Sequence, residues 1–374
     1  MIRVRPLVLL LAGIVLAGCG QGDDMWSVRA ADAEWVSGNA EVVLTSSVDG
    51  IVAREPGTGS ARWEVDLVPV WAPAIGADTD LVAVLADRDD QQQLCGLDVA
   101  DGQQRWCTVL LDEPFVEDST RNPVLTITPE AVVVTVNRGL VFGVDRMDGT
   151  LLWEERYAAE EDVPAVRPQL VGNGDTVALL YPPAGQLTLY DAASGQVDER
   201  VEVRGFLGPG GLSVADEGFV VDARPRVLRV DASGAVAWDE PTPVPGIELD
   251  GRVATDPVLV GDTLVVAPAV ISPGARFNIA AMDAATGAPR WQIADPPPLT
   301  RASFLNNGRL LAVGDRLVLL GADLHVLDPA TGEQLAEVSL GQDVERGAVV
   351  IDDSVVVIDG DGRLQRIVLG ELTE

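Results

Sequence analysis

The sequence predicts an all-β fold, an eight-bladed β-propeller of four-stranded antiparallel blades, on three observations. A motif of an acidic residue, a glycine and usually a tryptophan recurs about every 45 residues, a period typical of propeller blades. Short β-branched runs bounded by Gly, Asp or Asn separate the copies, and no stretch keeps a helical period. The C-terminal end supplies only three strands of a last blade, and the N-terminal end supplies a fourth. We therefore expect the propeller to occupy residues 25–370.

The first residues, 1–18, are predicted to be a signal peptide. Arginines precede an apolar run from Leu7 to Ala17, which is about half as long as a helix that spans a bilayer. The exit Leu16-Ala17-Gly18-Cys19 resembles the lipobox of bacterial lipoproteins, and this resemblance implies that Cys19 carries a lipid. The alternative is an ordinary secretory signal with a chance cysteine. With residues 19–24 as the lipidated cysteine and its tether, the chain is predicted to be exported and membrane-anchored, facing the extracytoplasmic side in the periplasm or on the outer face of the cell membrane.

The repeated motif is clearest where Asp283, Gly287 and Trp291 follow one another at intervals of four. The Asp-x-x-x-Gly segment indicates a hairpin turn, because Gly adopts positive φ and Asp accepts hydrogen bonds from nearby amides. The copy that ends in Trp238 has a turn one residue shorter. The residues at the Trp position of the complete copies are Trp63, Trp106, Trp153, Glu199, Trp238, Trp291 and Ala336.

The tryptophans are predicted to pack within the blades. If the turn places Asp98 opposite Gln104, Trp106 faces Gly96 across the hairpin. The same register opposes Trp63 to Ala53, Trp153 to Gly143, and Trp291 to Ala281. A large indole over a small neighbour is a sensible packing pair, so substrate stacking is the less favoured role.

The ring is predicted to close through one blade shared by the two ends of the chain. Residues 348–351, 355–358 and 364–369 give three strands, after which the chain ends. The missing strand, with its tryptophan, is found at 25–28 as Trp26 and its neighbours. Joining the terminal strands removes the exposed edges of an open ring. We expect a monomeric propeller.

A disulfide is predicted between Cys95 and Cys107. The register that pairs Trp106 with Gly96 also places these cysteines directly opposite each other, on the face away from the indole. Opposed residues lie roughly 4.5–5.5 Å apart at Cα, which a disulfide can bridge, and export places the pair in an oxidising compartment. The alternative is a pair of reduced cysteines that serve as small apolar core residues.

The motif in residues 280–291, Ala-Ala-Met-Asp-Ala-Ala-Thr-Gly-Ala-Pro-Arg-Trp, resembles the consensus of pyrroloquinoline-quinone (PQQ) repeats. The resemblance covers nearly all of residues 25–370. Size and lipobox make the chain similar to exported PQQ-like repeat lipoproteins, a family that includes the assembly lipoprotein of the Bam complex. It implies the propeller fold, but the same blade serves enzymes and non-enzymes.

An oxidoreductase of the quinoprotein type is one alternative function. The resemblance implies that such enzymes hold calcium and PQQ, use a catalytic Asp, and commonly place two adjacent cysteines under the cofactor. This chain has no Cys-Cys pair and is shorter than those enzymes. We therefore expect neither PQQ nor calcium to bind, and no catalytic, cofactor-binding or metal-binding residue is assigned.

Three other groups of residues were candidates for chemistry. The single histidine, His325, is predicted to be packed, because other blades have Val52, Phe142 or Leu228 at its position. Zinc sites need several such ligands, and a Ser-His-Asp triad would need His325 as its base. The acidic stretches 359–361 and 87–90 are predicted to be solvated turns, with a loose calcium site as the weaker alternative.

Charge excludes one class of partner. The chain carries 58 acidic and 26 basic residues, all of the latter Arg, for a net charge of −32. Nucleic acid and anionic lipid surfaces would repel such a protein. The favoured function is a lipid-anchored, non-catalytic scaffold that binds a cell-envelope protein, with residues 268–278 and 114–123 as candidate contact loops. The remaining alternative is a sensor or solute-binding propeller.

Overall fold

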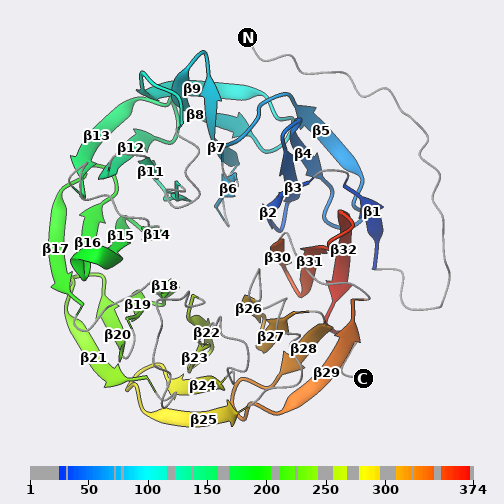
Figure 1. The fold of residues 1–374 in the computed structure, drawn as a ribbon, viewed down its shortest axis with the longest axis vertical. Helices are drawn as coiled ribbons and strands as arrows, with labels where there is room; N and C mark the ends of the chain where they lie inside the picture. The colour runs from blue at the N-terminus through cyan, green and yellow to red at the C-terminus, as the bar shows by residue number, and fades with distance from the viewer. Residues whose placement is uncertain are drawn as a thin grey trace.

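The β-branched runs of the sequence form short strands, and the Gly- and Asp-containing segments form the turns between them. The structure is a computed structural model, and it describes residues 25–30, 33–70, 73–76, 80–115, 123–136, 139–158, 168–203, 211–223, 226–242, 256–267, 278–294, 309–321, 323–340 and 347–370. These residues build eight four-stranded antiparallel sheets. The sheets are arranged as the blades of a ring around a common axis (Figure 1). The predicted eight-bladed propeller is confirmed.

The first four blades run in chain order from the innermost strand to the rim. Blade 1 contains β2 (Trp35–Asn39), β3 (Val42–Ser47), β4 (Gly50–Arg54) and β5 (Ala61–Val65). Blade 2 contains β6 (Ala74–Ile75), β7 (Leu81–Arg88), β8 (Gln91–Asp98) and β9 (Gln104–Leu111). Blade 3 contains β10 (Leu125–Ile127), β11 (Ala131–Val136), β12 (Leu140–Asp145) and β13 (Leu151–Arg156). Blade 4 contains β14 (Gln169–Asn173), β15 (Thr176–Tyr181), the short 3-10 helix η3 (Pro182–Ala184), β16 (Gln186–Asp191) and β17 (Val197–Glu202).

The other four blades repeat this order, with one exception. Blade 5 contains β18 (Gly211–Ala215), β19 (Gly218–Asp222), β20 (Arg226–Asp231) and β21 (Val236–Pro241). Blade 6 contains β22 (Val258–Val260), β23 (Thr263–Val266), β24 (Asn278–Asp283) and β25 (Pro289–Ala294). Blade 7 contains β26 (Arg309–Val313), β27 (Arg316–Leu320), β28 (Asp323–Leu327) and β29 (Gln334–Ser339). Blade 8 contains β30 (Gly347–Ile351), β31 (Ser354–Ile358), β32 (Arg363–Val368) and, from the other end of the chain, β1 (Ser27–Arg29).

The ring closes in blade 8, as predicted. Strand β1 pairs antiparallel with β32, with Ser27 opposite Gln365 and Arg29 opposite Arg363. The backbone N–H of Arg366 also donates to the carbonyl of Trp26 at 3.0 Å. Both ends of the chain therefore contribute to the same sheet, on the side of the ring where blade 1 meets blade 8 (Figure 1).

The hydrophobic core is divided among the junctions between blades. Each of eight apolar clusters joins residues of two neighbouring blades, because both faces of every sheet pack on a neighbour. The largest fully buried aromatic side chains, Phe142 and Phe219, belong to the junctions between blades 2 and 3 and between blades 4 and 5. Stability therefore depends on each blade keeping contact with both of its neighbours.

The predicted tryptophan register is confirmed in detail. Trp106 lies opposite Gly96, and the structure opposes Trp63 to Ala53, Trp153 to Gly143 and Trp291 to Ala281. In the blade with the shorter turn, Trp238 lies opposite Arg229.

One part of that register is wrong: Gln104 lies opposite Leu97 and not opposite Asp98. The residue between Gln104 and Trp106, Arg105, has no partner of its own, so the strand contains a β-bulge. Corresponding shifts occur one residue before the Trp position in the other complete blades. The bulge leaves the Trp pairs in place because it lies between them and the turn.

Candidate functional site

The tryptophans join each blade to the next one. The indole N–H of Trp153, on β13, donates to the carbonyl of Ala192 in blade 4 at 2.8 Å. The same ring lies against Gly195, where a Cβ would come within 2.5 Å of it and where φ is +69°. The turn glycine of the motif is thus required twice, by backbone conformation and by the indole. The six indole donors and their carbonyl acceptors are Trp26 and Pro56, Trp63 and Val99, Trp106 and Arg146, Trp153 and Ala192, Trp238 and Ala284, and Trp291 and Pro329.

Two of the eight junctions have no tryptophan at this position. Between blades 4 and 5, the side chain of Glu199 lies against Gly234. There Asn173 links the inner strands, because its amide donates to the carbonyls of Ala215 and Gly218 at 2.9 and 3.1 Å. Between blades 7 and 8, Ala336 packs on the edge of the apolar cluster that the two blades share. The six predicted tryptophans therefore lie at blade junctions, and each donates its indole N–H to the neighbouring blade.

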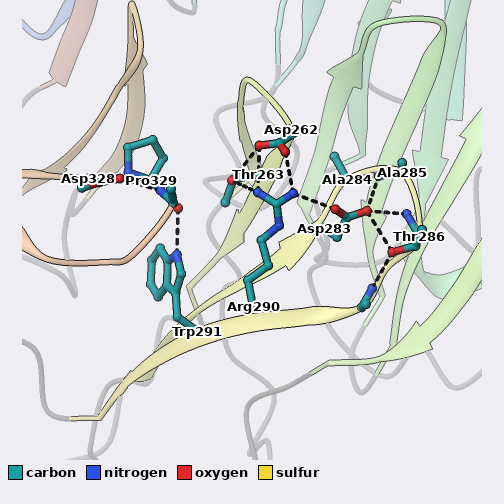
Figure 2. Close-up of polar contacts among 12 residues, drawn as sticks. Asp262, Thr263, Asp283, Ala284, Ala285, Thr286, Arg290, Trp291, Asp328 and Pro329 are labelled. Carbon is teal, nitrogen blue, oxygen red and sulfur yellow. Dashed lines mark hydrogen bonds and ion pairs between the residues drawn. The ribbon is translucent and has the colours of Figure 1, made fainter.

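Carboxylates in the turns of blades 2 and 6 are paired with arginine. In Figure 2 the guanidinium of Arg290 lies between Asp262 and Asp283, and its Nη2 is 2.6 Å from an oxygen of each. Its Nη1 also donates to Thr263 Oγ1 at 2.6 Å. The other oxygen of Asp283 accepts hydrogen bonds from the backbone N–H and the hydroxyl of Thr286. Both acids therefore serve to hold the hairpin of blade 6.

Blade 2 repeats this arrangement. Arg105 Nη2 is 2.5 Å from Asp80 and 2.7 Å from Asp98, and Arg146 of blade 3 reaches Asp80 at 3.2 Å. Arg105 and Arg290 are both bulge residues, which explains why their side chains reach the turn instead of pairing across the hairpin. Sequence reasoning missed this network. The one available signal was the arginine that precedes Trp63, Trp106 and Trp291.

The arginine network predicts a stability difference that depends on pH. Hydrogen bonds from Arg290, then from Thr286, lower the pKa of Asp283 from 3.8 to about 2. A depressed folded-state pKa contributes stability above the ordinary value of 3.8, and this contribution disappears as the pH falls towards 2. We expect Arg290→Gln to melt below the wild type at pH 6, with the two curves converging between pH 4 and pH 2.

Thermal unfolding across this range, with carboxyl NMR titration of Asp283, measures the effect. Arg316→Gln is the matched control, because the ion pair of Arg316 among the described residues is with its exposed neighbour Asp315, at 3.6 Å. A difference between Arg290→Gln and wild type that stays constant from pH 6 to pH 2 would show that the arginine acts through packing only.

Blade 2 contains the predicted disulfide. Cys95 on β8 and Cys107 on β9 are directly opposed, are joined through their Sγ atoms, and have Cα atoms 4.1 Å apart. Cys95 is fully buried in the cluster shared by blades 1 and 2. Its closure of a short loop between neighbouring strands is worth about 3 kcal/mol in the chain-entropy model.

The same blade has a long hairpin that the sequence did not predict. Strands β7, β8 and β9 each have 8 residues. The hairpin turns at Asp89 and Asp90, which have φ of 55° and 61°. Its side chains hold the segment after β9: Gln91 Nε2 donates to Asp112 Oδ1 at 2.7 Å, and Asp87 accepts from the N–H of Phe115 at 2.9 Å.

The acidic stretch at this turn is therefore partly structural. Burial raises the pKa of Asp87, and the hydrogen bond from Phe115 opposes that rise. Gln92, which is opposite Asp87, is fully buried and donates to the carbonyl of Pro114 at 3.3 Å. The expectation of solvated turns holds for Asp87, Asp89 and Asp90, which are all exposed, and the carboxylate of Asp87 also accepts a hydrogen bond from the backbone N–H of Phe115.

The remaining candidates do not form a reactive centre. His325 is packed, with 2% of its surface exposed, and its Nδ1 lies 3.7 Å from Glu337 Oε2. Asp359 is also buried, and its carboxylate accepts from the N–H groups of Asp361 and Arg363 and from Gln365. The expectation of a solvated turn is therefore wrong for Asp359, because its buried carboxylate holds the turn that resembled a calcium loop.

The described residues include no cluster of ligands that could hold calcium. Within the part of the chain that the structure describes, no three His, Cys, Asp or Glu side chains come together in a way that could hold a metal ion. The disulfide lies on the third and fourth strands of its blade, toward the rim and away from the ring axis (Figure 1). The expectation that neither group binds stays a prediction.

Some predicted features lie outside the described residues. These are the signal peptide 1–18, Cys19 with the tether to residue 24, and the greater part of both candidate contact loops. Among the residues that are described, no helix is long and apolar enough to cross a membrane.

Comparison with known proteins places the chain among PQQ-repeat propellers. The family model described as outer membrane protein assembly factor BamB matches residues 47–206 and 204–371. No curated protein sequence is significantly similar to the chain.

Similar solved structures include an envelope protein, a designed protein and an enzyme. BamB from Moraxella catarrhalis is 15% identical, with 91% of this chain and 95% of that chain covered and a TM-score of 0.62. The computationally designed protein Ika8 is 16% identical, with coverage of 91% and 98% and a TM-score of 0.64. A quinohemoprotein alcohol dehydrogenase from Pseudomonas putida is 12% identical, with coverage of 94% and 77% and a TM-score of 0.59. At these identities the likeness establishes the fold alone.

Proposed function

Since the chain belongs to the family of the outer membrane protein assembly factor BamB, we propose that it is a lipid-anchored scaffold of the cell envelope. It binds another envelope protein on the extracytoplasmic side and catalyses no reaction. The family match over residues 47–371 is the observation that carries the proposal. The lipobox-like sequence that ends in Cys19 supports the anchor, because it follows a predicted signal peptide and because the cysteine of a lipobox carries the lipid.

The side-chain chemistry of the described residues supports a binding role over catalysis. The tryptophans donate to neighbouring blades, and the acids of blades 2 and 6 pair with arginines. These groups hold a rigid ring, and a rigid ring presents loops and edges in fixed positions for recognition.

Co-purification from native membranes tests the proposal. Wild-type protein isolated in mild detergent is expected to bring one envelope protein in a fixed ratio, and Cys19→Ser is expected to move to the soluble fraction. If the wild type purifies without a partner both with and without a crosslinker, the scaffold proposal is wrong. If Cys19→Ser stays in the membrane fraction, the lipid anchor is wrong.

A PQQ-dependent oxidoreductase is the second candidate, favoured by the fold shared with quinohemoprotein alcohol dehydrogenases. Reconstitution with PQQ and calcium distinguishes the two. We expect no quinone absorbance to remain with the protein after gel filtration and no alcohol-dependent dye reduction. Retained cofactor together with turnover would show that the protein is an enzyme and that the scaffold proposal is wrong.

A further inference from the structure

The rim of the propeller consists of eight outer strands, and β9 differs from the other seven. It has 8 residues and contains no Asp, Glu or Pro. Strand β1 has 3 residues, and the six others have five or six residues with at least one Asp, Glu or Pro each. Charged residues, proline, β-bulges and short strands are among the features by which natural sheets prevent an outer strand from pairing with another chain. Among the described rim strands, β9 alone combines a length of 8 residues with the absence of Asp, Glu and Pro, and its regular edge is the stretch between the bulges at Arg105 and Leu110.

The disulfide identifies which backbone groups of β9 point outwards. Opposed residues of antiparallel strands are about 4.5 Å apart at Cα where they exchange no hydrogen bonds, and about 5.5 Å apart where they do. Cys95 and Cys107 are 4.1 Å apart, so Cys107 belongs to a pair without hydrogen bonds. Because the two kinds of pair alternate, Val109, opposite Gln93, also belongs to one. The N–H and C=O groups of Cys107 and Val109 therefore face away from β8.

Nothing in the described part of the chain occupies this edge. β9 ends its sheet, and no backbone hydrogen bond outside the blade involves Cys107 or Val109 among the described residues. The chain that follows β9 crosses over the hairpin towards Gln91 and Asp87, away from the outer edge. Figure 1 places β9 on the rim of the ring, with β8 on its inner side.

The surroundings of the edge define what could pair with it. Val109 is 44% exposed, and the turn of blade 3 that accepts a hydrogen bond from Thr108 carries Met147, which is 70% exposed. The exposed acid Asp148 directly follows Met147 in sequence, and the whole chain has a net charge of −32. An occupant must supply backbone donors and acceptors, apolar side chains at alternate positions, and positive charge.

We propose that the outer edge of β9 binds an extended, basic segment of another polypeptide as a fifth strand of blade 2. This inference rests on the proposed protein-binding function and names the surface and the partner chemistry. Main-chain hydrogen bonds to Cys107 and Val109 supply affinity, and the side chains on both faces of the added strand supply selectivity. The disulfide fixes β9 against β8 before binding, which reduces the ordering that association requires.

A proline variant tests the edge without removing a bond of the blade. Val109→Pro deletes an outward N–H, and the same position of β21, three residues after its tryptophan, already holds Pro241. The fold therefore accepts proline there. Arg156→Pro makes the same change on β13, opposite Leu140, and is the matched control.

The probe is a short fluorescein-labelled peptide in which lysine and threonine alternate with valine, titrated into the soluble mature protein and followed by anisotropy. Wild type and Arg156→Pro are expected to bind it equally, and Val109→Pro about tenfold or more weakly. The peptide N-methylated at alternate residues, which cannot pair along one edge, is expected not to bind the wild type. This second probe keeps the test valid if Val109→Pro does not fold.

Several results would overturn the inference: equal binding by Val109→Pro, equal weakening by Arg156→Pro, no binding by the wild type, or equal binding of a peptide with glutamate for lysine. Sedimentation of the wild type without peptide tests whether a second copy of this chain occupies the edge instead. A dimer that Val109→Pro abolishes would assign the edge to a second copy of this chain. Failure of the peptide titration leaves the co-purification of an envelope partner unchanged, so the two proposals fail separately.

Discussion

A mature chain that begins at residue 31 is expected to lose on the order of 5 kcal/mol of unfolding free energy relative to one that begins at residue 25. The deletion removes β1, and with it the indole of Trp26, whose N–H donates to Pro56 at 2.7 Å. It also exposes the outer edge of β32 and opens the cluster shared by blades 8 and 1, to which Ala30 belongs.

Denaturant unfolding of the two soluble forms measures this loss. The chain beginning at residue 25 is the control, because it lacks residues 1–24 but keeps the strand. Identical transitions for the two forms would mean that β1 adds nothing to blade 8, and the closure of the ring would have to be assigned to other contacts.

Trp153→Ala is expected to cost about 3–5 kcal/mol, because Trp153 is buried between blades 3 and 4 and leaves a cavity there. The indole also stacks on Tyr190 of blade 4, with ring centroids 5.8 Å apart. Trp153→Phe separates the two contributions of the side chain. It keeps most of the apolar contact and loses the hydrogen bond to Ala192, so we expect a smaller loss that includes about 1 kcal/mol for that bond.

The measured quantity is again the free energy of unfolding, and hydrogen exchange shows which blades are destabilised. Exchange should accelerate in blades 3 and 4 and stay slow in blade 8. Trp153→Ala with wild-type stability would contradict the role of the tryptophans as the joints between blades.

The propeller and its strand register could be predicted because the sizes of the side chains indicate which residues are opposite each other in a hairpin. In the four copies with the common turn length, each tryptophan lies over a Gly or an Ala, as Trp106 does over Gly96 and Trp153 over Gly143, so these pairs are visible within the sequence. The same register predicted the opposition of Cys95 and Cys107. The shared blade was predictable because three strands at one end and one at the other leave a single way to complete the ring.

The bulge and the arginine network could not be predicted from the same pattern. Because Arg105 is unpaired, only the residue pairs between the bulge and the turn shift. The sizes of the side chains in those pairs do not reveal which residues are opposite each other. The partners of Arg290 lie in two different turns, and Asp262 is 28 residues away, so their meeting depends on the folded sheet. The long hairpin of blade 2 was hidden for a similar reason, because its glutamines and aspartates are typical of a solvated connection.

Crosslinking of the full-length protein in intact envelopes, analysed by mass spectrometry, tests the central claim most directly. The account predicts crosslinks from the propeller to one envelope protein that depend on Cys19 and survive in the absence of PQQ. Crosslinks that are scattered over many abundant proteins, together with calcium- and PQQ-dependent oxidation by the purified chain, would contradict it.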